Sequence, residues 1–192
     1  MWRRLQRLDE RLLRRSARAR SPLRDRALVA VTRAASYSRL WLVIAAALIL
    51  FGGRRGQRAA ARGLIAVCIA ATVANGPAKL LVRRRRPARG SPPSLIAMPR
   101  STSFPSGHSA SAFAFAAGVS AELPALAPAI LPLAGAVAYS RTHTGVHYPS
   151  DVAAGVAIGI GSAVLAGRMP PPRCGRGEIE SSAVSARYPG GA

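Results

Sequence analysis

Two histidines and one aspartate are the residues of this sequence whose types and spacing first indicate chemistry. His147 and Asp151 are four positions apart, so on a helix they would share one face. A carboxylate bonded to one imidazole nitrogen fixes the tautomer and leaves the other nitrogen available as a nucleophile. His108 supplies a second imidazole that can exchange a proton near neutral pH.

Basic residues near these histidines predict a site for an anion. Lys79 and Arg86 are seven positions apart, which is two helical turns, so they share a face if the helix continues between them. An ammonium and a planar guanidinium together suit a phosphate, and Arg141 adds a third cation. We expect Ser106 to cap a helix whose first-turn amides attract an anion, with Gly107 allowing close approach of the backbone.

The elements that must position these residues are five apolar segments. The chain has 192 residues and a formal net charge of +21, yet 49% of its residues are hydrophobic. The segments comprise residues 40–51, 63–82, 106–121, 125–139 and 152–167. They are rich in alanine and glycine and lack alternation, so helices are favoured over a barrel. We predict an all-α fold, a polytopic transmembrane bundle of five spans, or six if residues 27–38 form a further membrane element.

The arginines lie in blocks between these segments, which is typical of a membrane protein facing anionic headgroups. A nucleic-acid-binding protein would more often carry its basic residues on one soluble face. We therefore expect membrane lipids, and no nucleic acid, as partners, while the sequence does not indicate an oligomeric state. Two cysteines exclude a disulfide framework.

Counting the spans brings the chemical residues together. Lys79 and Arg86 follow the second span, and His108 begins the third. Arg141 ends the fourth span, and Asp151 begins the fifth. Because successive spans alternate in direction, all these residues should meet at one face of the membrane.

Three sequence motifs carry a resemblance to a known family. The segments KLLVRRRRP, PSGH and SRTHTGVHYPSD, at residues 79–87, 105–108 and 140–151, resemble the signature motifs K-x6-R-P, P-S-G-H and S-R-x5-H-x3-D of the type 2 phosphatidic acid phosphatase family. Every specified position is matched. The resemblance covers roughly residues 40–167. It implies an integral, multi-pass plasma-membrane enzyme, with its active site on the extracytoplasmic side, that hydrolyses lipid phosphate or diphosphate esters without a metal or other cofactor.

The resemblance also implies roles for individual residues. His147 would attack phosphorus and form a phosphohistidine, Asp151 would orient it, and His108 would protonate the leaving oxygen and then activate water. Five residues would bind the substrate phosphate: Lys79, Arg86, Ser106, Gly107 and Arg141.

Other residues receive weaker predictions. His143 occupies a free position of the third motif, and we expect it at the rim of the site or supporting a tautomer. Arg83, Arg84 and Arg85 should face headgroups or a diphosphate. Trp2 and Trp41 should anchor the chain at the membrane interface.

The sequence divides into a basic amphipathic segment at residues 1–38, a membrane-embedded domain at 39–168 and a disordered basic tail at 169–192. With the motifs outside, residues 54–62 and the tail lie inside, in agreement with the positive-inside rule. Five spans then put residues 1–39, with a local charge of +9 from 12 arginines and three acidic residues, outside, against that rule.

Several lipid substrates fit the resemblance. They are a polyprenyl diphosphate such as undecaprenyl diphosphate, a polyprenyl monophosphate, phosphatidic acid, phosphatidylglycerol phosphate and a polyprenyl-phosphoryl sugar phosphate. Similarity to short actinobacterial members favours polyprenyl-linked substrates. Vanadium haloperoxidases share the motifs but are large soluble proteins. The alternative is a non-catalytic membrane protein whose basic clusters dock anionic lipids or partners.

Overall fold

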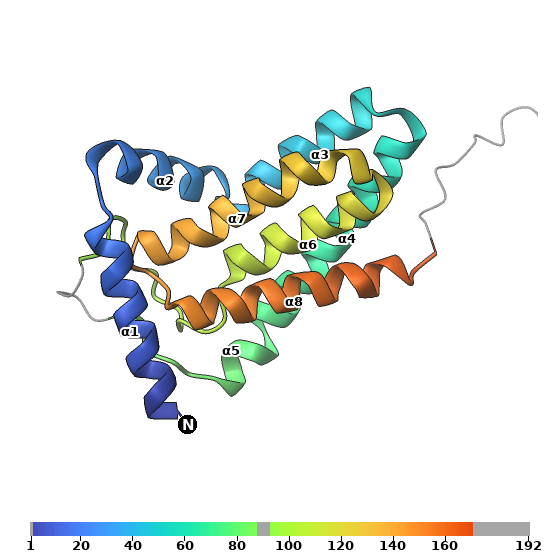
Figure 1. The fold of residues 1–192 in the computed structure, drawn as a ribbon. Coiled ribbons are helices and arrows are strands. Elements are labelled where there is room, and N and C mark those ends of the chain that lie inside the picture. Colours follow the sequence, from blue (N-terminus) through green and yellow to red (C-terminus); the bar gives the residue numbers. More distant parts are fainter. Residues whose placement is uncertain (1, 88–92, 171–192) are drawn as a thin grey trace, which may run out of the picture.

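Residues 2–87 and 93–170 are described by a computed structural model, and every regular element in these ranges is a helix (Figure 1). The α-helices are α1 (Trp2–Arg18), α2 (Pro22–Ala34), α3 (Arg39–Phe51), α4 (Gly53–Asn75), α5 (Pro77–Leu81), α6 (Gly107–Glu122), α7 (Ala127–His143) and α8 (Pro149–Gly167). Two short 3-10 turns lie at Ser36–Ser38 and Pro124–Leu126. The predicted all-α class is confirmed. The predicted disordered tail lies, beyond residue 170, outside the described residues.

Five helices, α3, α4, α6, α7 and α8, run side by side and form the body of the molecule (Figure 1). Helix α6 packs between α4 and α8. Small residues permit this close approach: a Cβ added at Gly155 of α8 would lie 2.4 Å from the backbone oxygen of Ser106, the residue before α6, and one at Gly159 would lie 2.4 Å from that of Ala110 in α6. Alanine and glycine therefore determine which helix faces meet.

One tryptophan belongs to this core. Trp41 of α3 is 1% exposed, and its ring lies 5.4 Å from that of Phe115 on α6. The prediction that Trp41 anchors the chain at the membrane interface is wrong, because the large aromatic ring fills the space between α3 and the alanine-rich α6. The side chain of Trp2 lies outside the described part of the chain.

Membrane-crossing capacity is concentrated in a few helices. Gly53–Leu81 and Pro149–Gly167 are long and apolar enough to cross a membrane, and α2 with the segment Ser36–Phe51, bent by 60°, would make a third span. Helices α6 and α7 have 16 and 17 residues. At 1.5 Å per residue they extend about 24–26 Å, less than a hydrocarbon core of about 30 Å. Two or three candidate spans are thus found where five or six were predicted.

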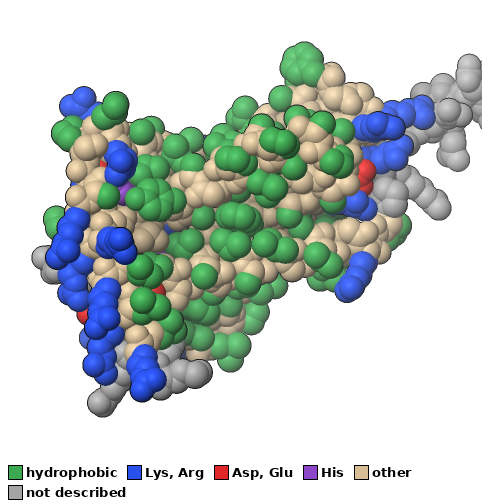
Figure 2. All heavy atoms as spheres, viewed as in Figure 1, with side chains coloured by type: hydrophobic (Ala, Val, Ile, Leu, Met, Phe, Trp, Pro, Cys, Tyr) green, Lys and Arg blue, Asp and Glu red, His purple; other side chains and the backbone are tan. Residues whose placement is uncertain are grey.

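The charged side chains gather at the two ends of the bundle, with hydrophobic side chains along its length (Figure 2). Helix α1 crosses one end, where it contacts α7 and α8 (Figure 1). Helix α2 packs against α7 at the same end. Both basic N-terminal helices therefore lie at the end where α6 and α8 begin.

Candidate active site

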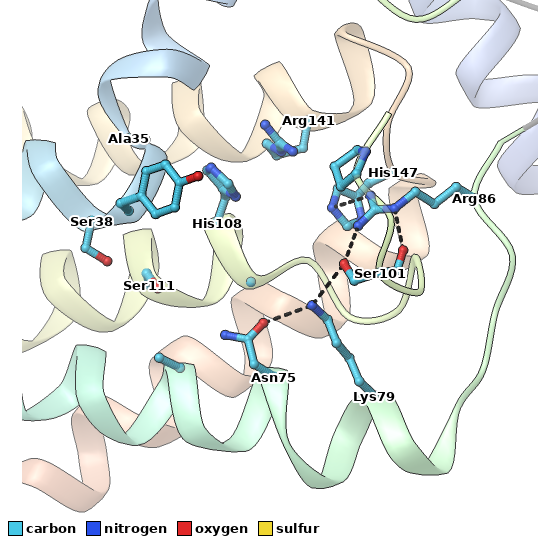
Figure 3. Close-up of a pocket in the computed structure, with 14 residues that line it drawn as sticks. Ala35, Ser38, Asn75, Lys79, Arg86, Ser101, His108, Ser111, Arg141 and His147 are labelled. Carbon is cyan, nitrogen blue, oxygen red and sulfur yellow. Dashed lines mark hydrogen bonds between the residues drawn. The ribbon is translucent and has the colours of Figure 1, made fainter. Parts of the chain in front are cut away.

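The predicted residues meet in a cavity at the α1 end of the bundle. The cavity has a volume of about 250 Å³ (Figure 3). Six of the predicted residues line it: Lys79, Arg86, Gly107, His108, Arg141 and His147. They come from α5, the following loop, α6, α7 and the loop before α8. The structure therefore brings these six residues together at one end of the bundle, whereas their place at one face of a membrane stays a prediction.

Asp151 lies directly behind His147. His147 Nδ1 faces Asp151 Oδ2 at 3.7 Å, within ion-pair range but longer than a hydrogen bond. The carboxylate is fully buried and held from several sides: Tyr148 N donates to Oδ2 at 2.9 Å, Arg84 Nη1 donates to Oδ1 at 2.9 Å, and Ser103 Oγ donates to Oδ2. The contact between Tyr148 N and the Asp151 carboxylate belongs to the capping box that begins α8.

The other imidazole nitrogen of His147 points toward Arg86. Arg86 Nη1 lies 3.1 Å from His147 Nε2. Because a guanidinium can only donate, Nε2 is the acceptor and carries the lone pair. Burial, together with the positive charges of Arg141 and Arg86, lowers the pKa of His147 to about 4 against the opposing effect of Asp151. At neutral pH the ring is therefore uncharged, with a nucleophilic lone pair at Nε2.

Arg86 is fixed by the loop around it. Its Nε donates to Ser101 O at 2.8 Å, and its Nη1 donates to Val146 O at 2.8 Å. The condition for Lys79 and Arg86 to share a helix face is not met: α5 ends at Leu81, and residues 82–87 are not helical. Burial lowers the pKa of Arg86 from its ordinary value, while Asp151 opposes this shift.

Lys79 approaches the cavity from α5. Its Nζ donates to Asn75 Oδ1 at 2.9 Å and lies 3.4 Å from Ser101 Oγ (Figure 3). The break at Gly76, before Pro77, ends α4 and starts this short helix. The ammonium group is thereby placed beside Arg86.

The N-terminus of α6 carries the PSGH residues. Ser106 is the N-cap, and its Oγ accepts from Ser109 N at 3.4 Å, so the predicted cap is confirmed. Ser106 is fully buried and is not among the lining residues, and its predicted contact with phosphate stays a prediction. A Cβ added at Gly107 would lie 3.3 Å from Asn75 Oδ1. His108 lines the cavity, and in the described part of the chain its Nε2 has no hydrogen-bond partner.

Arg141 depends on a residue that the sequence did not reveal. Its side chain is buried, and its Nη1 donates to Thr32 Oγ1 of α2 at 2.9 Å. Thr32 Oγ1 also lies 2.7 Å from Ser140 Oγ. Helix α2 therefore helps to position one of the three predicted cations.

His143 is not among the residues that line the cavity, so the predicted rim position is wrong, while the alternative role of supporting a tautomer stays a prediction. The residue is fully buried, and its Nε2 lies 2.7 Å from Asp25 Oδ1 of α2. Its backbone oxygen accepts a hydrogen bond from Arg20 Nη2 at 3.0 Å. These contacts attach the N-terminal segment to α7.

Arg84 is also placed differently from its prediction. It is 8% exposed and bridges Asp9 of α1 and Asp151, whereas Arg83 and Arg85 are exposed. Burial opposes the charge, but the hydrogen bonds and charges of the two carboxylates raise the pKa of Arg84 above its ordinary value. The sequence did contain a signal for a buried acidic partner of Arg84. The chain has only seven Asp and Glu residues, and Asp9 lies among arginines.

The cavity has two chemically different halves. The cations and His147 occupy one side of His108, and Ala35, Ser38 and Ser111 lie on the other (Figure 3). Tyr37 and Ser38, on this second side, have φ values of 54° and 60°, which are uncommon for residues other than glycine. One half can thus hold a phosphate against a nucleophile while the other half meets an uncharged group.

Within residues 2–87 and 93–170, no group of three His, Cys, Asp or Glu side chains is placed to hold a metal ion.

Comparison with known proteins supplies the family context. Residues 60–173 match a family described as the PAP2 superfamily. A decaprenylphosphoryl-5-phosphoribose phosphatase of Mycobacterium tuberculosis is 39% identical over 124 residues, which cover 62% of this chain and 65% of the relative. The match therefore spans just under two thirds of that protein. The enzyme of the same name from Mycolicibacterium smegmatis is 36% identical over 129 residues, covering 66% of this chain and 68% of the relative.

Two solved structures share the fold. Aquifex aeolicus LpxE superimposes with a TM-score of 0.70 and 26% identity, covering 83% of this chain and 94% of that one. A transmembrane PAP2-type phosphatidylglycerolphosphate phosphatase from Bacillus subtilis gives a TM-score of 0.66 at 24% identity, with 84% of each chain covered. At that identity the second likeness concerns the fold alone.

Proposed function

This chain belongs to the PAP2 superfamily, and from that premise we propose that it is a membrane phosphatase that hydrolyses a lipid phosphate monoester through a phosphohistidine at His147. The observation that carries the proposal is the environment of the His147 ring. Its Nε2 lone pair is directed at Arg86, its Nδ1 faces Asp151, and its low pKa keeps it neutral.

In the first step, His147 Nε2 attacks phosphorus and the bond to the leaving oxygen breaks. The phosphate displaces the guanidinium of Arg86 from Nε2, so that this group binds phosphoryl oxygens instead. His108 takes up a proton when the dianionic phosphate binds beside it, and donates this proton to the leaving alkoxide. Asp151 stabilises the positive charge that develops on the ring of His147, with the 3.7 Å separation closing as the imidazolium forms.

In the second step, a water molecule attacks phosphorus and the P–N bond breaks. His108, now neutral, accepts the proton of this water, and inorganic phosphate leaves. Both steps pass through a transition state with negative charge on the equatorial oxygens. Lys79, Arg86 and Arg141 stabilise that charge, and Ser106 and the Gly107 amide complete the binding set at the N-terminus of α6.

For the substrate, we propose a polyprenyl-phosphoryl sugar phosphate. The relatives from two mycobacteria are named decaprenylphosphoryl-5-phosphoribose phosphatases. The uncharged half of the cavity, with the hydroxyls of Ser38 and Ser111 and the aromatic ring of Tyr37, suits the sugar that carries the phosphate. A volume of about 250 Å³ fits a headgroup, and the polyprenyl chain would remain in the bilayer.

The protein is an integral membrane protein with helical spans. We propose that the five helices of the bundle body, α3, α4, α6, α7 and α8, all cross the bilayer, with the cavity on the extracytoplasmic side. The short helices α6 and α7 would be accommodated by local thinning and by arginines reaching toward the headgroups. Helix α1 would then lie on the outer leaflet, where Leu5, Leu8 and Leu12, all exposed, enter the headgroup region. The residue ranges 1–38, 39–168 and 169–192 remain our proposed division of the chain.

The test is phosphate release by the purified full chain in detergent, with EDTA present. The panel contains a polyprenyl-phosphoryl pentose phosphate, a polyprenyl monophosphate, a polyprenyl diphosphate, phosphatidic acid and phosphatidylglycerol phosphate. We expect the highest kcat/KM for the pentose phosphate, full activity in EDTA and none for His147→Ala. Activity that requires added metal, or that survives His147→Ala, would contradict the mechanism, whereas a preference for another lipid would contradict only the substrate.

A further inference from the structure

Helix α1 carries one buried acid in a stretch of mostly exposed, basic residues. Asp9 is 2% exposed. Its Oδ2 accepts from Arg84 Nη2 at 2.6 Å and from Ser150 Oγ at 2.6 Å, and its Oδ1 accepts from Ser150 N at 3.0 Å. Burying a carboxylate is costly unless it is paired and hydrogen-bonded, and here the partners come from two other segments.

The contacts of Asp9 lead directly to the nucleophile. Arg84 Nη1 donates to Asp151 Oδ1 at 2.9 Å, while Asp151 Oδ2 faces His147 Nδ1 at 3.7 Å. Asp9, Arg84 and Asp151 therefore form a chain of alternating negative and positive groups that ends at the neutral ring of His147, which becomes positive in the phosphohistidine. The guanidinium of Arg84 also lies over the ring of Tyr148, with Cζ 4.1 Å from the ring centroid, so its plane is fixed from a third side.

Asp9 affects Asp151 in two ways. It holds one edge of the Arg84 guanidinium, so that a single nitrogen contacts Asp151 Oδ1 and Oδ2 stays directed at the imidazole. It also balances the charge of Arg84, which otherwise would cancel the charge of Asp151 just where the phosphohistidine develops its positive ring. Loss of Asp9 would let Arg84 turn both of its nitrogens toward Asp151.

We propose that Asp9 is a positioning residue for phosphoryl transfer, acting through Arg84 and Asp151 on His147, so that α1 is part of the catalytic apparatus. The inference rests on the proposed function, because it takes His147 as the nucleophile. It assigns to the N-terminal segment a role in turnover besides any contact with the membrane surface.

Asp9→Asn in the full-length protein provides the test. Because misplacing a catalytic group by a fraction of an ångström to 1 Å can cost up to about 100-fold in rate, we expect kcat to fall roughly 10- to 100-fold while KM changes less than about threefold. Glu10→Gln is the matched control, since it makes the same charge change on the same helix, where Glu10 is exposed and lies 3.5 Å from Arg14. This control should keep kcat within about twofold of the wild type.

Glu122→Gln controls for loss of a partly buried ion pair. It removes the α6 carboxylate that pairs with Arg62 at 2.6 Å, at the end of the bundle opposite the cavity. We expect it to lower the unfolding temperature while leaving kcat within about twofold, because distant sites with no shared partners act independently.

A double-mutant cycle separates positioning from general stability. If Asp9 acts through Arg84, then Asp9→Asn should have no further effect on kcat in an Arg84→Gln background. The double variant also lacks the uncompensated buried charge, so it decides the question should the single variant not fold. Wild-type kcat in Asp9→Asn, or equal losses in both backgrounds, would overturn the proposal. If the single variant does not fold, a double variant with kcat well below that of Arg84→Gln alone would overturn it.

The proposed function and the role of Asp9 can be refuted separately. Activity in His147→Ala would remove the proposed function and this inference together. An inactive His147→Ala with a wild-type Asp9→Asn would remove this inference alone.

Discussion

The two ends of the helical bundle are both rich in arginine, but their arginines are in different environments. At the end where α4 begins, Arg54, Arg55 and Arg58 are exposed, and Arg62 forms a partly buried pair with Glu122 at 2.6 Å. At the cavity end, Arg84 and Arg141 are buried, and each is bonded to residues of other helices or loops.

This difference separates charges that are exposed to solvent from charges that the fold holds in place. Exposed guanidiniums are screened by water and salt, so their interactions are worth about 0–1 kcal/mol. A guanidinium that is buried and held in place acts in a lower dielectric without reorganising during the reaction. A net charge of +21 therefore says little about the site, whereas burial and partners distinguish the cations that the fold holds in place from those exposed to solvent.

The largest expected effect is at the nucleophile of the cavity end. His147→Ala removes the atom that bonds phosphorus, so kcat for a lipid phosphate monoester should fall by at least about 10⁴-fold. An unchanged unfolding temperature would show that the protein still folds. Residual activity within about 10-fold of the wild type would mean that His147 is not the nucleophile.

Substitutions of arginine by lysine compare the two ends directly. Arg141→Lys and Arg86→Lys keep the charge but lose the planar fork, so kcat/KM should fall roughly 10²- to 10³-fold. The matched change at the other end, Arg62→Lys, should stay within about twofold. Equal and small effects at both ends would instead favour the non-catalytic protein that uses charge alone to dock lipids.

The contact between α2 and the cavity should contribute a smaller amount. Thr32→Val removes the hydroxyl that accepts from Arg141 Nη1 at 2.9 Å, so kcat/KM should fall about 3- to 10-fold, the equivalent of one hydrogen bond. Thr72→Val is the control, because Thr72 donates within its own helix to Cys68 O at 2.9 Å. Similar losses in both variants would show that Thr32 does not act through Arg141.

The smallest expected change is in the pH dependence of the nucleophile. With the pKa of His147 lowered to about 4, the ring stays neutral as the pH falls from 8 to 5 and takes up a proton only below that range. NMR of ¹⁵N-labelled histidine in detergent, with His147 assigned by its loss in His147→Gln, should show no protonation of this ring at pH 6. A midpoint near the ordinary value of about 6.5 would contradict the buried, cation-flanked environment.

The convergence of the motifs could be predicted from the sequence because it needs only the alternating direction of helices. The helical class, the cap at Ser106 and the gathering of Lys79, Arg86, His108, Arg141 and His147 all followed from local patterns. The number of spans could not be predicted in this way. Helices of 16 and 17 residues are long enough to pack in the bundle but are shorter than the length that identifies a span.

The supporting residues could not be predicted for a physical reason. Asp9 meets Ser150 across 141 positions of sequence, and Thr32 meets Arg141 across 109, so both contacts depend on how the N-terminal helices fold back on the bundle. Residues 83–85 are three consecutive arginines that the sequence does not distinguish. The non-helical path of the chain after Leu81 turns Arg84 inward. Helical spacing could not relate Lys79 to the arginines that follow it, since α5 ends before they begin.

Trapping the covalent intermediate tests the central claim most directly. The wild-type protein is mixed with a lipid substrate carrying ³²P in its terminal phosphate, quenched in alkali within milliseconds, digested and mapped by mass spectrometry. We predict label on His147 that is stable in alkali and lost in acid, as expected for a phosphoramidate, and no label in His147→Ala. Label on another residue, or turnover with no labelled protein at any quench time, would contradict a phosphohistidine mechanism at this site.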